Sequence, residues 1–192
     1  MTNHNEEKIN KILQLIEIKD NLDILDVGCG TGILESFLLK YNPNSITAVD
    51  ISDKMIEVAK SKYDNNKINF ITQDIMEHKG VYDLIIVYSA YPHFYDKRAL
   101  VEHLSSMLNK GGKLVVAHSD SREKINNVHS KHNEVKEDRL PPAIETANIF
   151  SEHLYVDLII DNDEMYIVSG IKNKQKVFCT FCLLKPYIPC IF

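Results

Sequence analysis

The sequence predicts a doubly wound α/β domain, in which a mostly parallel sheet carries helices on both of its faces. Short apolar segments of strand length alternate along the chain with segments whose apolar residues recur every three or four positions, as on one face of a helix. Glycine-rich turns join some of these segments, at residues 28–32 and 111–112. Parallel neighbouring strands need crossover connections, which helices supply, and a chain of 192 residues has room for one such domain.

The first half of the chain gives regular alternation after a leading helix. Residues 5–18 place Ile9, Ile12, Leu13 and Ile16 three or four positions apart, which predicts an amphipathic helix. Ser52 is a good cap for the start of a later helix. The expected elements that follow the leading helix are strand 22–27, helix 33–40, strand 45–49, helix 52–59 and strand 68–72.

The second half continues this pattern and ends in an antiparallel hairpin. Its expected elements are strand 82–88, helix 98–108, strand 113–117, helix 143–150 and hairpin strands 154–161 and 164–169. The strongly polar residues 121–138 are expected to cover an active site or to connect the elements on either side of them. We expect one domain over residues 1–175, followed by an apolar tail with three cysteines, residues 176–192, to which the pattern assigns no role.

The charge balance argues against two classes of partner. The 22 basic and 27 acidic residues give a net charge of −5, which supplies no field that would gather nucleic acid or an anionic membrane surface. The first residues are polar and lack the apolar core of a secretory signal. We therefore expect a cytoplasmic protein that binds neither nucleic acid nor membrane, with its four irregularly spaced cysteines reduced.

The glycine-rich turn after the first strand indicates a nucleotide-like cofactor. Residues 25–32 read Leu-Asp-Val-Gly-Cys-Gly-Thr-Gly, and glycines there let a ligand approach the backbone beside free helix N–H groups. The third glycine comes one residue too early for the dinucleotide fingerprint, which argues against NAD, and no NTPase phosphate loop follows. Asp26 would repel a pyrophosphate and favour a cationic ligand.

This turn resembles the first motif of class I S-adenosylmethionine (SAM)-dependent methyltransferases, and the chain is similar to their small single-domain members. The resemblance implies SAM as the cofactor and a sheet of seven strands with the last strand antiparallel. It covers the chain from about residue 23 to about residue 170 and includes the second glycine turn. The ammonium and sulfonium groups of SAM are the cations that Asp26 would favour.

The resemblance also assigns cofactor contacts at the ends of successive strands. Asp50 matches the acidic residue that binds both ribose hydroxyls, and Asp74 matches the position beside the adenine amino group. Either aspartate alone could be a helix cap or turn residue, but their shared position at strand ends favours binding. The full expected set is Asp26, Gly28, Cys29, Gly30, Gly32, Asp50, Ile51, Met55, Asp74, Ile75 and Ser89.

The loop after the fourth strand indicates the kind of methyl acceptor. Residues 89–95 read Ser-Ala-Tyr-Pro-His-Phe-Tyr, without the Asn/Asp-Pro-Pro-Tyr or Pro-Cys motifs of DNA base methylation. Aromatic side chains with one imidazole suit a small, partly apolar acceptor that loses a proton as it is methylated.

Histidines near this loop are the candidate catalytic groups. His118 directly follows the fifth strand and is the first choice for a general base, with His93 as the second. A metal held by His93, His118 and His129 is an alternative, but no Cys-His or carboxylate-His spacing supports it and we expect none. His129 and His132, one helical turn apart, also fit a solvated helix.

These features predict an enzyme that transfers the sulfonium methyl group of SAM to a small-molecule acceptor and releases S-adenosylhomocysteine. Positioning, desolvation and one base would supply most of the catalysis because sulfonium is a good leaving group. A protein acceptor fits the resemblance less well. The alternatives are a non-catalytic SAM-binding regulator, an enzyme of aminopropyl transfer and an NAD-linked oxidoreductase, in that order.

Overall fold

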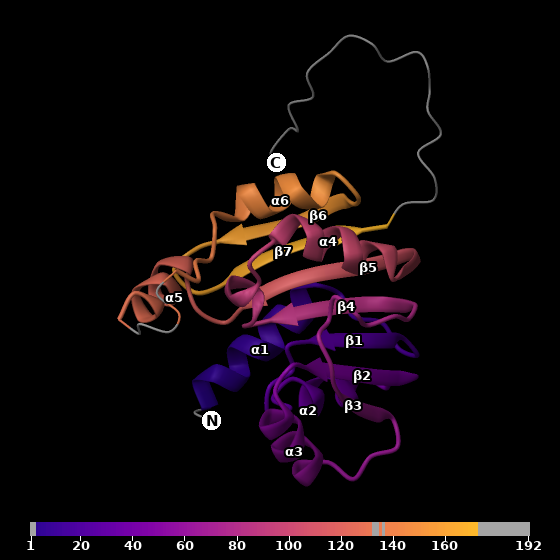
Figure 1. The fold of residues 1–192 in the computed structure, drawn as a ribbon. Coiled ribbons are helices and arrows are strands. Elements are labelled where there is room, and N and C mark those ends of the chain that lie inside the picture. Colours follow the sequence, from indigo (N-terminus) through magenta and orange to yellow (C-terminus); the bar gives the residue numbers. More distant parts are fainter. Residues whose placement is uncertain (1–2, 132–134, 136, 173–192) are drawn as a thin grey trace, which may run out of the picture.

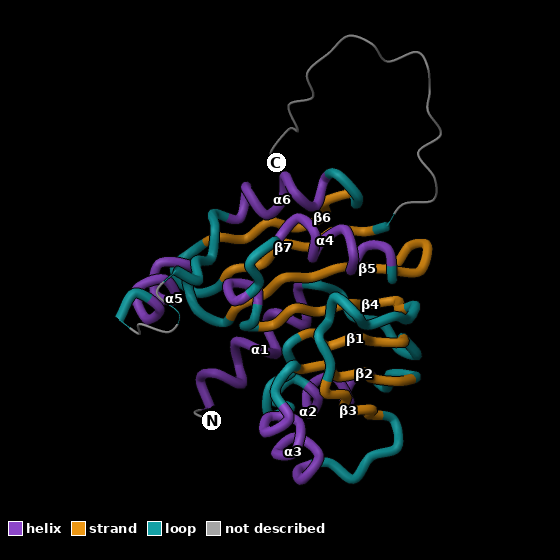
Figure 2. The backbone as a smooth tube through the Cα atoms, in the orientation of Figure 1, coloured by secondary structure: helices purple, strands orange, loops and turns teal. Residues whose placement is uncertain are grey.

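The computed structural model describes residues 3–131, 135 and 137–172. These residues form one sheet of seven strands with helices on both sides (Figure 1). The strands lie side by side in the order β3-β2-β1-β4-β5-β7-β6 (Figure 2). Their bounds are β1 Asp23–Val27, β2 Ser45–Asp50, β3 Ile68–Thr72, β4 Tyr82–Tyr88, β5 Leu108–His118, β6 Tyr155–Asp161 and β7 Tyr166–Ile171.

The strand directions confirm the predicted fold class. The neighbours from β3 to β5 pair in parallel, whereas β7 is antiparallel to both β5 and β6. The strand order reverses between β1 and β4, which are adjacent in the sheet but separated by two strands in the chain. Open α/β sheets bind ligands at the carboxyl ends of the strands at such a reversal.

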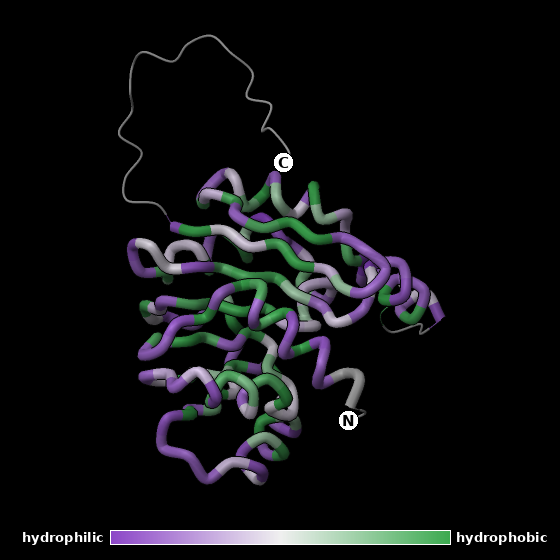
Figure 3. Tube along the Cα trace, turned by 180° about the vertical axis from the view of Figure 1, so that it is seen from behind, coloured by the Kyte–Doolittle hydropathy of each residue, from purple (hydrophilic) through white to green (hydrophobic). Residues whose placement is uncertain are grey.

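Helices cover both faces of the sheet and divide its core. The first three helices pack with small apolar clusters on one face, and α4 and α6 pack on the other. Apolar residues follow the strands between these layers (Figure 3). The helix bounds are α1 Asn3–Leu15, α2 Glu35–Leu38, α3 Asp53–Lys62, α4 Lys97–Ser106, α5 Arg122–His129 and α6 Ala143–Ser151, with 3-10 turns η1 Leu39–Tyr41 and η2 Tyr91–His93.

Side-chain caps fix where two of the site's helices begin. Ser52 accepts a hydrogen bond from the backbone N–H of Met55 at 3.4 Å, as predicted for the start of α3. Asp96 accepts from the N–H of Ala99 at 2.9 Å at the start of α4. These caps set the lengths of the loops that follow β2 and β4.

Three expected elements differ from the structure. The helix expected over 33–40 is split into α2 and η1, and Asn42 ends it in the left-handed conformation. The glycine pair 111–112 lies inside β5 instead of before it, because β5 starts at Leu108 and pairs there with Tyr82. The polar segment 121–138 contains α5, a helix without buried residues, capped by Ser121.

No helix in the described ranges is long and apolar enough to cross a membrane. The apolar tail expected at 176–192, and the end of the domain at residue 175, lie outside the described residues.

Candidate functional site

The glycine turn between β1 and α2 has φ angles that residues with a side chain rarely adopt. Gly28, Gly30 and Gly32 have φ angles of 70°, 54° and 75°, in the left-handed region where other residues are strained. A Cβ atom on Gly28 would lie 2.6 Å from the Cβ atom of Ala90, whereas one on Gly30 would enter open space. The turn therefore packs against the end of β4 at Gly28 and leaves room for a ligand at Gly30.

Asp50, at the end of β2, ties this turn to the sheet. Its carboxylate accepts the backbone N–H of Gly30 at 2.8 Å on one oxygen and that of Ser52 at 2.9 Å on the other. An ionised carboxylate offers about four lone-pair positions. Asp50 thus holds the loop and keeps acceptor capacity for the ribose hydroxyls that the resemblance assigns to it.

A cavity of about 780 Å³ opens beside this turn, a size typical of cofactor sites. Apolar side chains at its rim are exposed, with 74% of Ile51 and 44% of Met55 accessible. Such a rim suits the faces of an aromatic base. The cavity brings together eight residues expected to bind the cofactor: Gly28, Gly30, Asp50, Ile51, Met55, Asp74, Ile75 and Ser89.

A second cavity of about 370 Å³ shares Gly28, Gly30 and Ser89 with the first and adds Asp26 and Cys29. Within the described residues, the Oδ1 atom of Asp26 has no hydrogen-bond partner although the side chain is 1% exposed. A buried carboxyl without a partner favours a cationic ligand group. Burial and the nearby carboxyls raise the pKa of the Cys29 thiol, which therefore stays protonated.

Gly32 lies away from the other expected cofactor residues and lines neither of these two cavities. A Cβ atom there would lie 2.9 Å from the ring of Tyr63 and 3.3 Å from the Cβ atom of Ala59. The structure therefore shows Gly32 packed against α3, and its expected contact with the cofactor stays a prediction.

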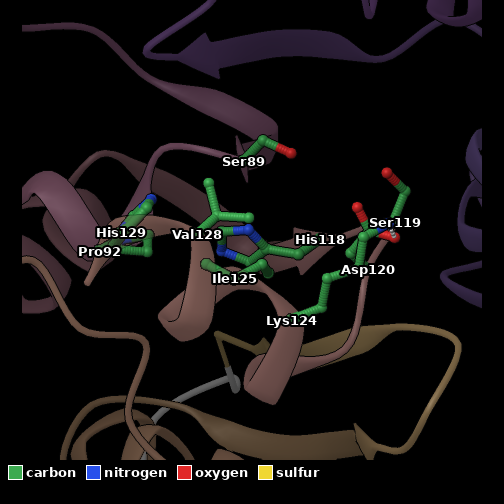
Figure 4. A pocket seen from close by; sticks show the side chains of 9 residues that line it. All are labelled: Ser89, Pro92, His118, Ser119, Asp120, Lys124, Ile125, Val128 and His129. Atoms are coloured by element: carbon green, nitrogen blue, oxygen red, sulfur yellow. Dashed lines mark hydrogen bonds and ion pairs between the residues drawn. The ribbon is translucent and has the colours of Figure 1, made fainter. Parts of the chain in front are cut away.

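A third cavity of about 210 Å³ lies between the end of β5 and α5 (Figure 4). Ser89 lines all three cavities, so the third cavity meets the other two at this residue. At its mouth, Asp120 accepts from Lys124 at 2.7 Å and from Lys8 of α1 at 3.4 Å. The lining residues are Ser89, Pro92, His118, Ser119, Asp120, Lys124, Ile125, Val128 and His129.

Asp138 holds two imidazole rings, that of His129, which lines the third cavity, and that of His93, which lines the first. The Nδ1 atom of His93 lies 2.8 Å from a carboxylate oxygen of Asp138, and the Nδ1–H of His129 donates to its backbone carbonyl at 2.6 Å. The two rings stack with centroids 5.2 Å apart. Since Nδ1 is the donor in both contacts, each neutral ring carries its free lone pair on Nε2. No motif or spacing in the sequence marks Asp138 as a residue of the site.

His118 is the most deeply buried histidine of the site. It is 3% exposed, it contacts the ring of Tyr166 edge-on, and its Nε2 atom has no hydrogen-bond partner among the described residues. Burial, and then the nearby His129 and His93, lower the pKa of His118 to about 3. The ring is therefore neutral in ordinary conditions and is a weak base.

The metal alternative gains no support from the histidine geometry. Within the described residues, no group of three histidine, cysteine or acidic side chains is placed to hold a metal ion. His132 lies outside the described residues.

The reversal of strand order, the glycine turn and the carboxylate at the end of β2 define a class I SAM-dependent methyltransferase, as the sequence resemblance implied. The family comparison agrees. A family model described as a methyltransferase domain matches residues 1–154, and the chain belongs to this family. SAM is the cofactor of the class.

Curated relatives match about half of the chain. A malonyl-[acyl-carrier protein] O-methyltransferase of Ilyobacter polytropus is 42% identical over 50% of this chain and 37% of its own length. A ubiquinone biosynthesis O-methyltransferase of Coxiella burnetii is 31% identical over 57% of this chain and 48% of its own length. The chain thus spans less than half the length of these relatives.

Solved structures share the fold at low sequence identity. The N-methyltransferase NodS from Bradyrhizobium japonicum superposes with a TM-score of 0.71 at 16% identity, covering 90% of this chain and 98% of that chain. A magnesium protoporphyrin IX methyltransferase from Synechocystis, with bound S-adenosylhomocysteine, gives a TM-score of 0.65 at 18% identity over 89% and 82% of the two chains.

Proposed function

We propose that the protein transfers a methyl group from SAM to an oxygen atom of a small-molecule acceptor. The observation that carries this proposal is the position of Ser89, which lines both cofactor-side cavities and the histidine-lined cavity. When bound, SAM supplies a methyl group on a sulfonium leaving group. The names of the matched relatives, which are O-methyltransferases, support oxygen as the acceptor atom.

The residues at the ends of β1 to β3 would hold the cofactor in an extended arrangement. Asp50 would accept from the ribose hydroxyls, the exposed rim at Ile51 and Met55 would contact the adenine, and Asp26 would pair with the methionyl ammonium group. Gly30 leaves open space at the point where a side chain would block the ligand. The site therefore fits both the size and the charge of SAM.

His93 is the better candidate for a general base than His118. Its Nδ1 atom is held by the Asp138 carboxylate, which fixes the tautomer and stabilises a proton gained at Nε2. His118 is buried with a pKa lowered to about 3, so we assign it the role of orienting the acceptor through Nε2. A hydroxyl acceptor needs a base to take its proton. From this histidine–aspartate pair we infer that the acceptor group is a hydroxyl.

The alternatives from the sequence receive less support. Membership of the methyltransferase domain family favours an enzyme over a non-catalytic SAM-binding regulator. The polar groups of the third cavity include two histidines, which a regulator would not require. Lys124 at its mouth is unsuited to a polyamine, the acceptor of aminopropyl transfer.

The test begins with calorimetric titration of SAM, S-adenosylhomocysteine and NAD, followed by turnover with phenols, aliphatic alcohols, carboxylic acids, amines and thiols. We expect the two SAM-related ligands alone to bind, and S-adenosylhomocysteine to form with hydroxyl compounds. Binding of NAD alone would overturn the cofactor assignment. Product formation with amines or thiols only would overturn the choice of oxygen.

A further inference from the structure

Two buried carboxyl groups lie next to each other under the glycine turn. Glu35 of α2 is fully buried and neither of its carboxyl oxygens has a hydrogen-bond partner among the described residues, and Oδ1 of Asp26 also has none. The groups are close enough for a proton on one to be hydrogen-bonded by the other. Two such groups cannot both be ionised in a buried site without a large cost.

Among the described residues, no cation forms an ion pair with either carboxyl group. Lys62, at the end of α3, lies near Glu35 but its amine donates to the backbone carbonyl of Thr31 at 2.7 Å. The hydroxyl group of Tyr63 donates a hydrogen bond to the backbone carbonyl of Gly32. The Asp50 carboxylate from β2 adds further negative charge, which acts on Asp26.

The remaining neighbour in the turn, Cys29, contributes no charge because its thiol stays protonated. Burial raises the pKa of Glu35 to about 7. Burial, and then the charge of Glu35, raise the pKa of Asp26. Glu35 therefore loses its proton first, at about pH 7, while Asp26 keeps its own, so the ligand-free pair holds two protons below this pH and shares one proton above it.

We propose that Asp26 and Glu35 hold two protons in the ligand-free site, release one when the methionyl ammonium group of the cofactor binds beside Asp26, and share the other. This inference rests on the proposed function. Asp26 contacts the cavity, whereas Glu35 is fully buried behind it, so Glu35 acts through Asp26 as a positioning residue.

The exchange balances in charge. The pair changes from 0 to −1, the ligand brings an ammonium charge of +1, and the released proton leaves to solvent. A cation beside a carboxyl lowers its pKa, which drives the proton off. Cofactor affinity then rises with pH up to about pH 7, the pH at which the ligand-free pair loses the first of its two protons.

The experiment is calorimetric titration of S-adenosylhomocysteine into the whole chain at about pH 6 and about pH 8, in buffers of different ionisation enthalpy. We expect about one proton released per ligand at the lower pH, little at the higher pH, and roughly ten-fold tighter binding at the higher pH. Methylthioadenosine lacks the amino-acid group, and its binding should release no proton. The variant Glu35→Gln should abolish the proton release, and Glu57→Gln, an exposed carboxyl of α3, should keep it.

The outcomes separate this inference from the proposed function. Binding of S-adenosylhomocysteine without proton release, or with the same release for methylthioadenosine, would overturn this inference and leave the proposed function standing. Absence of binding at both pH values would overturn both. The comparison of the two ligands uses the unchanged protein, so it decides the question even if Glu35→Gln does not fold.

Discussion

The two sides of the site are built in different ways. On the cofactor side, the backbone sets the geometry: left-handed glycines form the turn, and Asp50 holds Gly30 by its N–H group. On the acceptor side, side chains set the geometry. The proposed base pair, His93 and Asp138, is partly exposed, with 47% of the His93 side chain and 32% of the Asp138 side chain accessible. Cofactor binding and acceptor chemistry should therefore fail separately when residues on one side are changed.

The largest expected effect is on turnover. Replacing His93 by alanine removes the proposed base and should lower kcat by about 10²–10⁴-fold for a hydroxyl acceptor. SAM affinity, measured by calorimetry, should change far less than kcat, because His93 lines the edge of the cofactor cavity while the cofactor contacts of β1 and β2 stay intact. Asp138→Asn keeps the size of the side chain, and a drop in kcat of the same direction would confirm that Asp138 acts through His93.

Unchanged turnover of His93→Ala with a hydroxyl acceptor would refute the base assignment. A matched control is His103→Ala, whose ring lies on α4 and contacts the carbonyl of Ile75 instead of Asp138.

The next effect is on cofactor affinity. Asp50→Ala removes two charge-assisted hydrogen bonds to the backbone and the proposed ribose acceptor, and should weaken SAM binding roughly 100-fold. Asp64→Ala, which changes an exposed carboxylate after α3, should leave the Kd of SAM unchanged. If Asp50→Ala bound SAM as tightly as the parent protein, the ribose assignment would be wrong.

A substitution at Gly28 tests whether the glycine turn of the cofactor side packs against the end of β4, where the acceptor side begins. Gly28→Ala should lower the free energy of unfolding by about 1–3 kcal/mol, because of its left-handed φ and the clash with Ala90 next to Ser89. Gly111→Ala has a similar φ of 82° but no atom near the new Cβ, so it measures the conformational cost alone. Urea unfolding of both variants isolates the clash, and equal losses would show that Gly28 does not pack as described.

The smallest expected effects are on the pH dependence of the free energy of unfolding. A rise in pH removes the contribution of Glu35 on the cofactor side and restores that of His118 on the acceptor side. The pKa of Glu35 is raised from 4.5 to about 7, so its contribution to stability is complete below 4.5 and is lost as pH rises through about 7. The pKa of His118 is lowered from 6.5 to about 3, so its contribution is complete above 6.5 and is lost as pH falls towards 3.

Thermal unfolding of the ligand-free protein measures the contributions of Glu35 and His118 to stability. Relative to the parent protein, Glu35→Gln should raise Tm more at about pH 8 than at about pH 5, and His118→Gln should be more favourable at about pH 4 than at about pH 8. A pH-independent change in Tm would mean that the residue concerned does not titrate in this range.

The sequence predicted the cofactor side because its signals are local. The glycine turn, the aspartates at strand ends and the helix cap at Ser52 are set by conformational preferences within a few residues. The contact of His93 with Asp138 spans 45 positions in the chain, so no local pattern in the sequence indicates it. Helix α5 buries none of its residues, so no apolar spacing marked it.

Glu35 was missed for a different reason. It lies in a segment whose apolar spacing predicted an ordinary helix, and a glutamate in such a pattern normally faces solvent. Its burial follows from the short α2 and the tight turn before it, which place its side chain under Gly32, whose added Cβ would lie 3.5 Å from Oε2.

The contact between Lys8 and Asp120 has a practical consequence for expression. Lys8 lies near the start of α1, yet it reaches a residue that lines the cavity next to His118. An affinity tag fused to the amino terminus would adjoin this helix and disturb the mouth of that cavity. Acceptor screening and cofactor titrations are therefore both best done after the tag has been cleaved, because Asp120 also lines the second cavity, beside Asp26.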